Sequence, residues 1–348
     1  MSLRIVSKQR EDIVTSQQRP TDSAHASTVL ELRDGSFLVA WFGGSWEKDP
    51  NVAIWTATRS REGAWSYPRK VDDVIGVAQW NPVLFRLPDG NIMLFFKVGA
   101  TIPEWQTFVR VSSDEGKTWS ERRELVPGDT SGGRGPVKNK PILLSDGKTI
   151  VAPASKESEV EWDAFVDISR DNGKSWERSE FVPVRHASYN IQEVDQPYEK
   201  HRLWGKGMIQ PSLWEDEKGL HMFCRTNGSW IFRSDSSDGG RSWSLAYDTG
   251  LANNNSGLDL VRMQDGALVL CCNPVHNLPG YYKGPRTPLS LLYSEDGGEH
   301  WEKLCDLEEG QGDYCYPAII QASDGSLCVT YTWRRERIVF WNLKVERR

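Results

Sequence analysis

The chain has 348 residues and a formal net charge of −6; 38% of its residues are hydrophobic and 26% are charged. This acidic balance argues against a nucleic-acid partner, because nucleic-acid-binding proteins usually carry a basic patch. No apolar run reaches the roughly 18 residues of a transmembrane helix, so we expect no membrane partner. All-β folds of this length occur as one domain, and we predict a single domain over residues 1–348.

The N-terminal segment MSLRIVSKQRED lacks the apolar core of a signal peptide, so we expect a cytoplasmic protein, with a removed leader as the alternative. The six cysteines begin only at Cys224 and include no CxxC pair, which predicts reduced, mostly buried thiols and no zinc site. No motif implies a metal or any other cofactor. The oligomeric state is left open by the sequence.

One unit recurs six times along the chain: an apolar strand, a turn that ends in glycine, and a second apolar strand. The turns end at Gly35, Gly90, Gly147, Gly219, Gly266 and Gly325, about 58 residues apart on average. The strands that follow them read SFLVAWF, NIMLFFK, KTIVAPA, LHMFCRT, ALVLCCN and SLCVTYTW. A β-rich unit of this size holds the four short strands of one propeller blade. We therefore predict an all-β, six-bladed β-propeller with four-stranded antiparallel blades. Because few residues follow Trp333, Leu3–Ser7 should complete the sixth blade.

A second pattern, Ser-x-Asp-x-Gly-x-x-Trp, interleaves with the first. It reads SSDEGKTW, SRDNGKSW, SSDGGRSW and SEDGGEHW, at residues 112–119, 169–176, 236–243 and 294–301. These are residues of a tight hairpin: Asp bonds backbone amides, Gly accepts a positive φ, and Trp packs beneath the turn. Such Asp-box hairpins lie far from the propeller axis, so we expect Asp114 and Asp171 to be structural.

In a propeller, the first strand of every blade lines the axis, so the residues at its start should converge. The six segments are His25-Ala-Ser-Thr, Trp80-Asn81-Pro82, Lys138-Asn139-Lys140-Pro141, Ile209-Gln210-Pro211-Ser212, Asn254-Asn255-Ser256-Gly257 and Tyr314-Cys315-Tyr316-Pro317. Polar side chains in all six predict a binding site for a polar ligand in an axial funnel. A hydrated polar channel without a ligand is the alternative. We expect the long insert Val184–Gly207, which is rich in polar and aromatic residues, to form a lip over this site.

With these motifs, the whole chain resembles the sialidases (neuraminidases), in particular their bacterial BNR/Asp-box relatives. The resemblance implies three arginines for the substrate carboxylate, a tyrosine nucleophile assisted by a glutamate, and an aspartate acid/base. Tyr316 in YPAIIQASDG matches the nucleophile, Arg225 in HMFCRTNG the second arginine, and Arg286 in GPRTPLSLLYSEDGG the third.

Two positions depart from the sialidase pattern. His25-Ala-Ser stands where the family has Arg-Ile-Pro, and Gln210 stands where the family has the assisting glutamate. Since Gln cannot accept a proton, Tyr316 needs another base, and His25 is the replacement that we predict. Glu47 or Asp49, in GGSWEKDPN, takes the place of the acid/base.

We expect the substrate to be a carbohydrate with an acidic group. Its carboxylate would meet Arg225 and Arg286, with Lys138 and Lys140 adding to the positive field. We also count Asn139, Asn255, Asp259, Trp80 and Asn81 as substrate-binding candidates. Two reactions suit this set: hydrolysis of a sialoside or another acidic glycoside, and β-elimination from a uronic acid, as in relatives that act on rhamnose–glucuronate linkages. A non-catalytic carbohydrate-binding propeller is the third interpretation.

Overall fold

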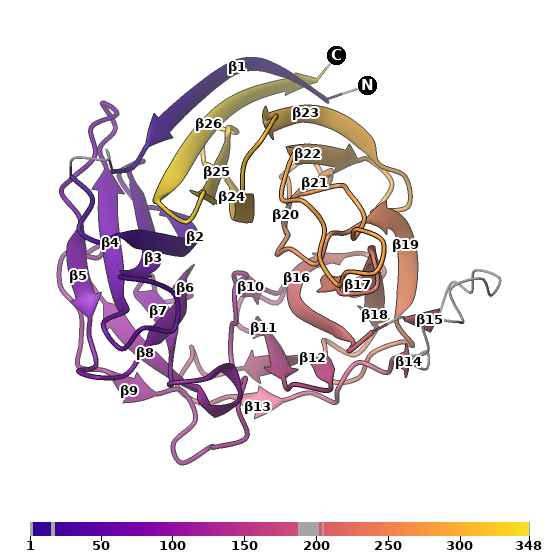
Figure 1. Ribbon diagram of the computed structural model, residues 1–348, viewed down its shortest axis with the longest axis horizontal. Helices are drawn as coiled ribbons and strands as arrows, with labels where there is room; N and C mark the ends of the chain where they lie inside the picture. The colour runs from indigo at the N-terminus through magenta and orange to yellow at the C-terminus, as the bar shows by residue number, and fades with distance from the viewer. Residues whose placement is uncertain (1–2, 15–17, 187–201, 204, 348) are drawn as a thin grey trace.

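The computed structural model describes residues 3–14, 18–186, 202–203 and 205–347. Six four-stranded antiparallel sheets are arranged in a ring around a central axis (Figure 1). The predicted all-β, six-bladed propeller is therefore confirmed. Most of the insert Val184–Gly207, including Tyr189 and Tyr198, lies outside the described residues. No helix in the described ranges is long and apolar enough to cross a bilayer.

The blades follow one another around the ring in chain order. Blade one holds β2 (Ser23–Glu31), β3 (Phe37–Gly44), β4 (Ala53–Arg59) and β5 (Arg69–Asp72); blade two holds β6 (Gln79–Arg86), β7 (Ile92–Val98), β8 (Gln106–Ser112) and β9 (Arg123–Glu124). Blade three holds β10 (Ile142–Leu143), β11 (Ile150–Glu157), β12 (Trp162–Ser169) and β13 (Glu177–Arg178). A short 3₁₀ helix, η1 (Ile102–Glu104), precedes β8.

The second half repeats the plan. Blade four holds β16 (Met208–Asp216), β17 (Gly219–Thr226), β18 (Trp230–Ser236) and β19 (Tyr247–Ala252); blade five holds β20 (Asp259–Arg262), β21 (Leu268–Cys272), β22 (Leu289–Ser294) and β23 (Glu302–Glu308). Between blades three and four, β14 (Arg185–His186) pairs in parallel with β15 (Arg202–Leu203). The predicted second strand of each blade appears as β3, β7, β11, β17, β21 and β25.

Blade six is built from both ends of the chain. It holds β24 (Tyr314–Gln321), β25 (Leu327–Trp333) and β26 (Arg337–Arg347), and β1 (Leu3–Asp12) is its outermost strand. The pairing of β1 with β26 runs from Leu3 opposite Arg347 to Asp12 opposite Val339. The expected closure by the N-terminal segment is confirmed and extends to Asp12. Closure pairs a strand that would otherwise be a free sheet edge.

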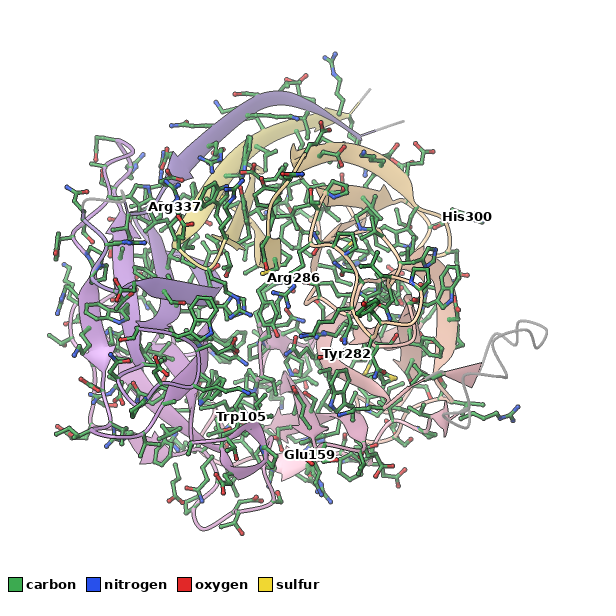
Figure 2. The ribbon with its side chains drawn as sticks, in the orientation of Figure 1. Trp105, Glu159, Tyr282, Arg286, His300 and Arg337 are labelled. Atoms are coloured by element: carbon green, nitrogen blue, oxygen red, sulfur yellow. The ribbon has the colours of Figure 1, made fainter. Side chains whose placement is uncertain are left out.

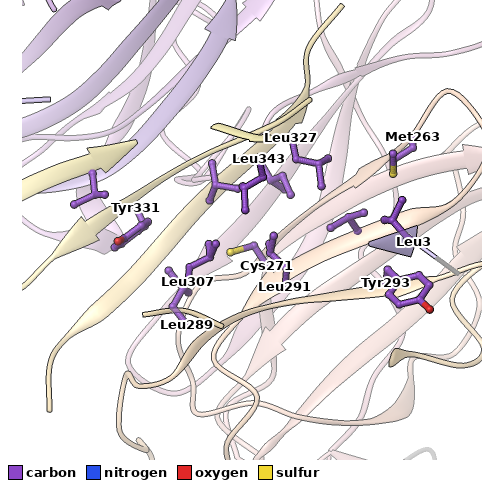
Figure 3. Close-up of a cluster of buried hydrophobic side chains, with 14 of the residues drawn as sticks. Leu3, Met263, Cys271, Leu289, Leu291, Tyr293, Leu307, Leu327, Tyr331 and Leu343 are labelled. Atoms are coloured by element: carbon purple, nitrogen blue, oxygen red, sulfur yellow. The ribbon is translucent and has the colours of Figure 1, made fainter. Parts of the chain in front are cut away.

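The core consists of apolar layers between neighbouring blades. Among the described residues, six buried clusters each join side chains of two adjacent blades. The layer between blades five and six, for example, packs Val269 and Leu291 against Leu327 and Val329 (Figure 3). Because each sheet is covered on both faces, its strands are apolar on both sides. The six cysteines are free thiols, and all but Cys305 are buried.

The Asp boxes have the predicted hairpin chemistry. In the first, Asp114 Oδ1 accepts hydrogen bonds from the Ser112 hydroxyl and from the Thr118 amide, both at 2.8 Å. Gly116 adopts a φ of +81°, and a Cβ there would lie 2.8 Å from Leu38 Cδ2, so a side chain is excluded. The four boxes follow β8, β12, β18 and β22, the third strands of their blades, and not the strands nearest the axis.

Candidate active site on the propeller axis

A bulge interrupts the innermost strand of four blades at the same place. The pairing register shifts around residues 26, 81, 210 and 316, and these residues have φ values of +54°, +44°, +55° and +56°. Left-handed backbone at a residue other than glycine costs about 1–3 kcal/mol and often occurs where a side chain serves a function. Asn255, just before β20, has the same conformation with φ of +58°. Five of the six axial segments thus share one strained geometry.

Three of these left-handed residues meet at a single guanidinium, that of Arg225 on β17. Its Nη1 donates to the Tyr316 hydroxyl at 2.9 Å and to Gln210 Oε1 at 3.2 Å. Its Nη2 donates to Asn255 Oδ1 at 2.8 Å and to the Asn255 carbonyl at 2.5 Å. Gln210 Nε2 in turn donates to the Tyr316 hydroxyl at 3.4 Å. The Tyr316 oxygen therefore accepts from two N–H groups, which would stabilise negative charge developing on it.

Arg225 is only 6% exposed, and its hydrogen-bond partners among the described residues are neutral. No carboxylate among the described residues forms an ion pair with it. Buried charges are normally paired, because leaving water costs several kcal/mol per ion. The hydrogen-bond partners of Arg225 are thus neutral, and the Glu157 carboxylate acts on it without an ion-pair contact, so a ligand anion could be a directly bonded charged partner.

His25 lies against Tyr316, with the two ring centroids 4.3 Å apart. Its Nδ1 is 2.8 Å from Thr332 Oγ1, whereas its buried Nε2 has no hydrogen-bond partner among the described residues. Burial and the positive charges of Arg335, Arg286, Arg225 and Lys138 lower the pKa of His25 well below its usual 6.5. The imidazole is therefore neutral at neutral pH.

Two further arginines surround the same rings. The Arg286 guanidinium lies 5.7 Å from the centroid of the Tyr316 ring, and Figure 2 shows Arg286 beside the central opening. Its Nη1 is 3.1 Å from Cys315 Sγ and 3.6 Å from Asp313 Oδ1. Arg335, in the turn between β25 and β26, accepts a backbone hydrogen bond from Ala24 through its carbonyl. The structure thus brings His25, Arg225, Arg286 and Tyr316 together, as the sequence predicts.

The two candidate acids of the first blade differ in their surroundings. Glu47 Oε2 accepts a hydrogen bond from Arg335 Nη1 at 2.6 Å, so this carboxylate is held near the arginine that neighbours His25. The backbone of Asp49 closes the loop. Its amide donates a hydrogen bond to the Trp46 carbonyl, and its carbonyl accepts one from the Val52 amide. The geometry therefore favours Glu47 over Asp49 as the acid.

Four other predicted ligand residues form a separate network, the lysine cluster: Lys138, Asn139, Lys140 and Asp259. Lys138 Nζ donates to Asn139 Oδ1 and to the carbonyls of Leu258 and Pro317, at 2.7, 2.8 and 2.5 Å. Lys140 Nζ binds Asp259 Oδ2 and the Leu260 carbonyl, both at 2.8 Å. These bonds cross from blade three to blades five and six. The network's donors are thus engaged in holding blades together.

The other two residues of the lysine cluster, Asn139 and Asp259, also have hydrogen-bond partners within the protein. Asn139 Nδ2 donates to the carbonyls of Gln210 and Pro211, at 2.9 and 3.0 Å. Asp259 also accepts from the Ser212 hydroxyl at 2.7 Å and from the Ile319 amide at 2.9 Å. Burial is the largest influence on Lys138, and it lowers the pKa of that ammonium to about 7 although Asp259 opposes the effect. This placement favours a structural role over substrate contact.

Trp80 and Asn81 lie in different surroundings although they are adjacent in sequence. Trp80 is 1% exposed, its indole N–H donates to the Gly99 carbonyl at 2.9 Å, and its ring packs edge-on against Trp105. This ring belongs to the apolar layer between blades one and two and presents no face to a ligand. Asn81 occupies the bulge position of blade two, in register with Gln210 and Tyr316.

Two residues near this site were not predicted as site residues. Arg335 follows the last core strand, where the sequence leaves a solvated face and a ligand contact as equal alternatives, and no motif singles out Glu157. Glu157 ends β11, and both Arg225 and a hydrogen bond from Gln210 act on its carboxylate. The strand IVAPASKE turns polar at its last residues, and that change was the available signal.

Fold and site together define an Asp-box propeller with a basic, aromatic axial site. A family model described as a BNR repeat-like domain matches residues 35–329. The chain therefore belongs to the BNR repeat-like family. Comparison with curated protein sequences gives no match.

Several solved structures share this fold. A protein of unknown function from Dyadobacter fermentans DSM 18053 matches with a TM-score of 0.74 and 17% identity, covering 99% of each chain. Hadza microbial sialidase Hz136 matches with a TM-score of 0.74 and 16% identity, covering 95% of this chain and 68% of its own. Trypanosoma rangeli sialidase matches with a TM-score of 0.71 and 13% identity, covering 97% of this chain and 59% of its own. At these identities the likeness establishes the sialidase-like fold.

Proposed function

We propose that this protein is a sialidase-like glycoside hydrolase that cleaves an anionic sugar at the Tyr316 cluster, defined as His25, Gln210, Arg225, Arg286 and Tyr316. The observation that carries the proposal is the buried Arg225 guanidinium, which has neutral partners and donates to the Tyr316 hydroxyl at 2.9 Å. An anionic substrate would give Arg225 a directly bonded charged partner, and the same contact would set its sugar ring beside the tyrosine oxygen.

In the proposed reaction, Arg225 and Arg286 bind the substrate carboxylate. The Tyr316 oxygen attacks the anomeric carbon and forms a glycosyl–tyrosine bond while the glycosidic C–O bond breaks. The hydroxyl proton passes to the unpaired Nε2 of His25, and Glu47 protonates the leaving oxygen. Water then attacks the anomeric carbon and gives its proton to the Glu47 carboxylate, while the bond from the anomeric carbon to the Tyr316 oxygen breaks. His25 returns its proton to Tyr316, and the free acidic sugar leaves.

The test uses Tyr316→Phe, with Tyr293→Phe as its matched control. Tyr293 donates its hydroxyl to Glu302 at 2.7 Å on β22, a strand outside the axial site, so this change removes an equivalent hydroxyl elsewhere. On 4-methylumbelliferyl sialoside and glucuronide, Tyr316→Phe should lower kcat/KM by about 10³-fold or more. Tyr293→Phe should retain activity. An active Tyr316→Phe enzyme would rule out the tyrosine nucleophile.

One observation favours a second reaction, β-elimination from a uronic acid. The unpaired, neutral His25 Nε2 could remove the proton at C5, and the arginines would stabilise the enolate-like carboxylate. The C4–O bond then breaks as a C4–C5 double bond forms, and Tyr316 donates its proton to the departing oxygen. Growth of absorbance at 235 nm on glucuronate-containing glycans, lost in His25→Ala, would identify this reaction. Glycan binding without either signal would instead identify a binding propeller.

A further inference from the structure

Glu157 brings a carboxylate from blade three to the residues around Tyr316. It is the last residue of β11, and Ser155, two residues earlier, lies on the same face of that strand. The Ser155 hydroxyl donates to Glu157 Oε1 at 3.4 Å and accepts from the Gln210 amide at 3.4 Å. This face of β11 is therefore directed at residue 210 of β16.

The amide of Gln210 has a defined orientation in this network. Arginine can only donate hydrogen bonds, so the atom 3.2 Å from Arg225 Nη1 must be the Gln210 oxygen. The amide nitrogen then faces Tyr316, at 3.4 Å from its hydroxyl. The Ser155 hydroxyl joins the Glu157 carboxylate to the backbone amide of Gln210, and the Gln210 side chain is among the groups that lower the pKa of Glu157. Gln210 thus links a carboxylate, the tyrosine and the arginine.

We propose that Glu157 is a positioning residue that acts through Gln210. Its carboxylate holds the amide in the orientation that donates to Tyr316 and accepts from Arg225. Blade three would in this way provide the negative charge that a glutamine at position 210 lacks. The inference depends on the proposed function for its catalytic consequence, but the contact between residues 157 and 210 can be tested without turnover.

Several charged groups face Glu157 and affect its ionisation. Burial raises its pKa, whereas Arg225 on β17, Lys97 on β7 and the bonds from Ser155 and Gln210 oppose that rise. The other acidic residues nearby are directed to partners of their own. Glu104 of the adjacent η1, for example, accepts from the Thr101 hydroxyl at 2.8 Å.

The experiment compares four proteins: the wild type, E157Q, Q210E and the double variant E157Q/Q210E, which moves the carboxylate to residue 210. Glu159→Gln, an exposed change two residues along (labelled in Figure 2), is the matched control. The thermal unfolding midpoints of the four proteins, measured from pH 4 to 8, give a double-mutant cycle that needs no substrate. We expect Q210E alone to lower the unfolding midpoint at neutral pH, because two carboxylates then share the site, and the double variant to recover it.

Activity supplies the second measurement. E157Q should lower kcat/KM by about 10–100-fold, the usual cost of losing a residue that orients a catalytic group, and should alter the acid limb of the pH profile. The double variant should return to within about three-fold of wild type. Additive midpoints in the cycle, or an E157Q protein that behaves as Glu159→Gln does, would overturn the inference. A wild type inactive on acidic glycosides would refute the proposed function, while the unfolding cycle would still decide the contact.

Discussion

The Tyr316 cluster and the lysine cluster both combine basic and amide side chains near the propeller axis, yet their polar groups are partnered differently. In the lysine cluster, the Lys140 ammonium meets the Asp259 carboxylate at 2.8 Å, and Lys138 is bonded to an amide oxygen and two carbonyls. In the Tyr316 cluster, Arg225 has neutral partners and His25 keeps an unpaired ring nitrogen.

This contrast shows how a structural network can be distinguished from a binding site of the same composition. A satisfied buried network contributes to stability because breaking it leaves a desolvated charge behind. A network with unpaired buried groups lowers the stability of the folded protein. Such a network is therefore a candidate for a functional site. The variants below should therefore separate stability from activity.

The largest effect on stability is expected from Lys140→Met. This change leaves Asp259, which is 1% exposed, without its cationic partner, at a cost of about 3–5 kcal/mol in the free energy of unfolding. Guanidinium denaturation measures it. Lys70→Met breaks the exposed pair with Asp73 and should cost no more than about 1 kcal/mol. Equal losses in the two variants would show that the lysine cluster is not structural.

Arg225→Met should affect activity more than stability. The groups that lose a hydrogen-bond donor are neutral, so the free energy of unfolding should fall by about 1–3 kcal/mol. The value of kcat/KM on an acidic glycoside that the wild type cleaves should fall by about 10²–10³-fold, because Arg225 no longer donates to Tyr316 and the substrate carboxylate. Steady-state kinetics on equal amounts of folded protein provide the measurement. An Arg225→Met enzyme with wild-type kinetics would remove the basis of the anionic-substrate proposal.

A smaller, pH-dependent effect is expected at Lys138. The folded protein holds this ammonium with a pKa of about 7 instead of 10.5, so between these values the unfolded chain binds a proton that the folded chain has released. Raising the pH through that window therefore favours folding through this residue. Lys138→Met should lack this contribution. The difference in unfolding free energy between wild type and variant should grow in favour of the wild type from pH 7 to 10, and a constant difference would contradict the assignment.

Glu157 should make stability depend on pH in the opposite direction to Lys138. Its folded pKa is raised above the usual 4.5, so its stabilisation is present at low pH and is lost as the pH rises through the folded pKa. E157Q removes this dependence. Relative to the wild type, E157Q should therefore gain stability as the pH increases from 4 to 8, in the same unfolding experiments that test its contact with Gln210.

Local patterns in the sequence were sufficient for the architecture. The Asp-box hairpins are formed by residues within eight positions of one another, and the strand–turn–strand units repeat at a regular interval, so neither needs information from distant parts of the chain. The same alignment also identified the six segments that reach the axis, which include His25 and Tyr316, whereas Arg225 and Arg286 were expected there from the resemblance to sialidases.

The closure of the ring determined which polar side chains of those segments are paired within the protein. Lys138 has its partners 120 and 179 residues away, and Lys140 has Asp259 119 residues away, so no spacing rule could tell that these lysines are satisfied by the protein itself. Trp80 is drawn into an inter-blade layer for the same reason. Glu157 and Arg335 come from the end of a second strand and from a hairpin turn, outside the aligned segments. The pairing of these polar groups depends on contacts between different blades. Those contacts exist only in the tertiary structure and leave no local pattern in the sequence.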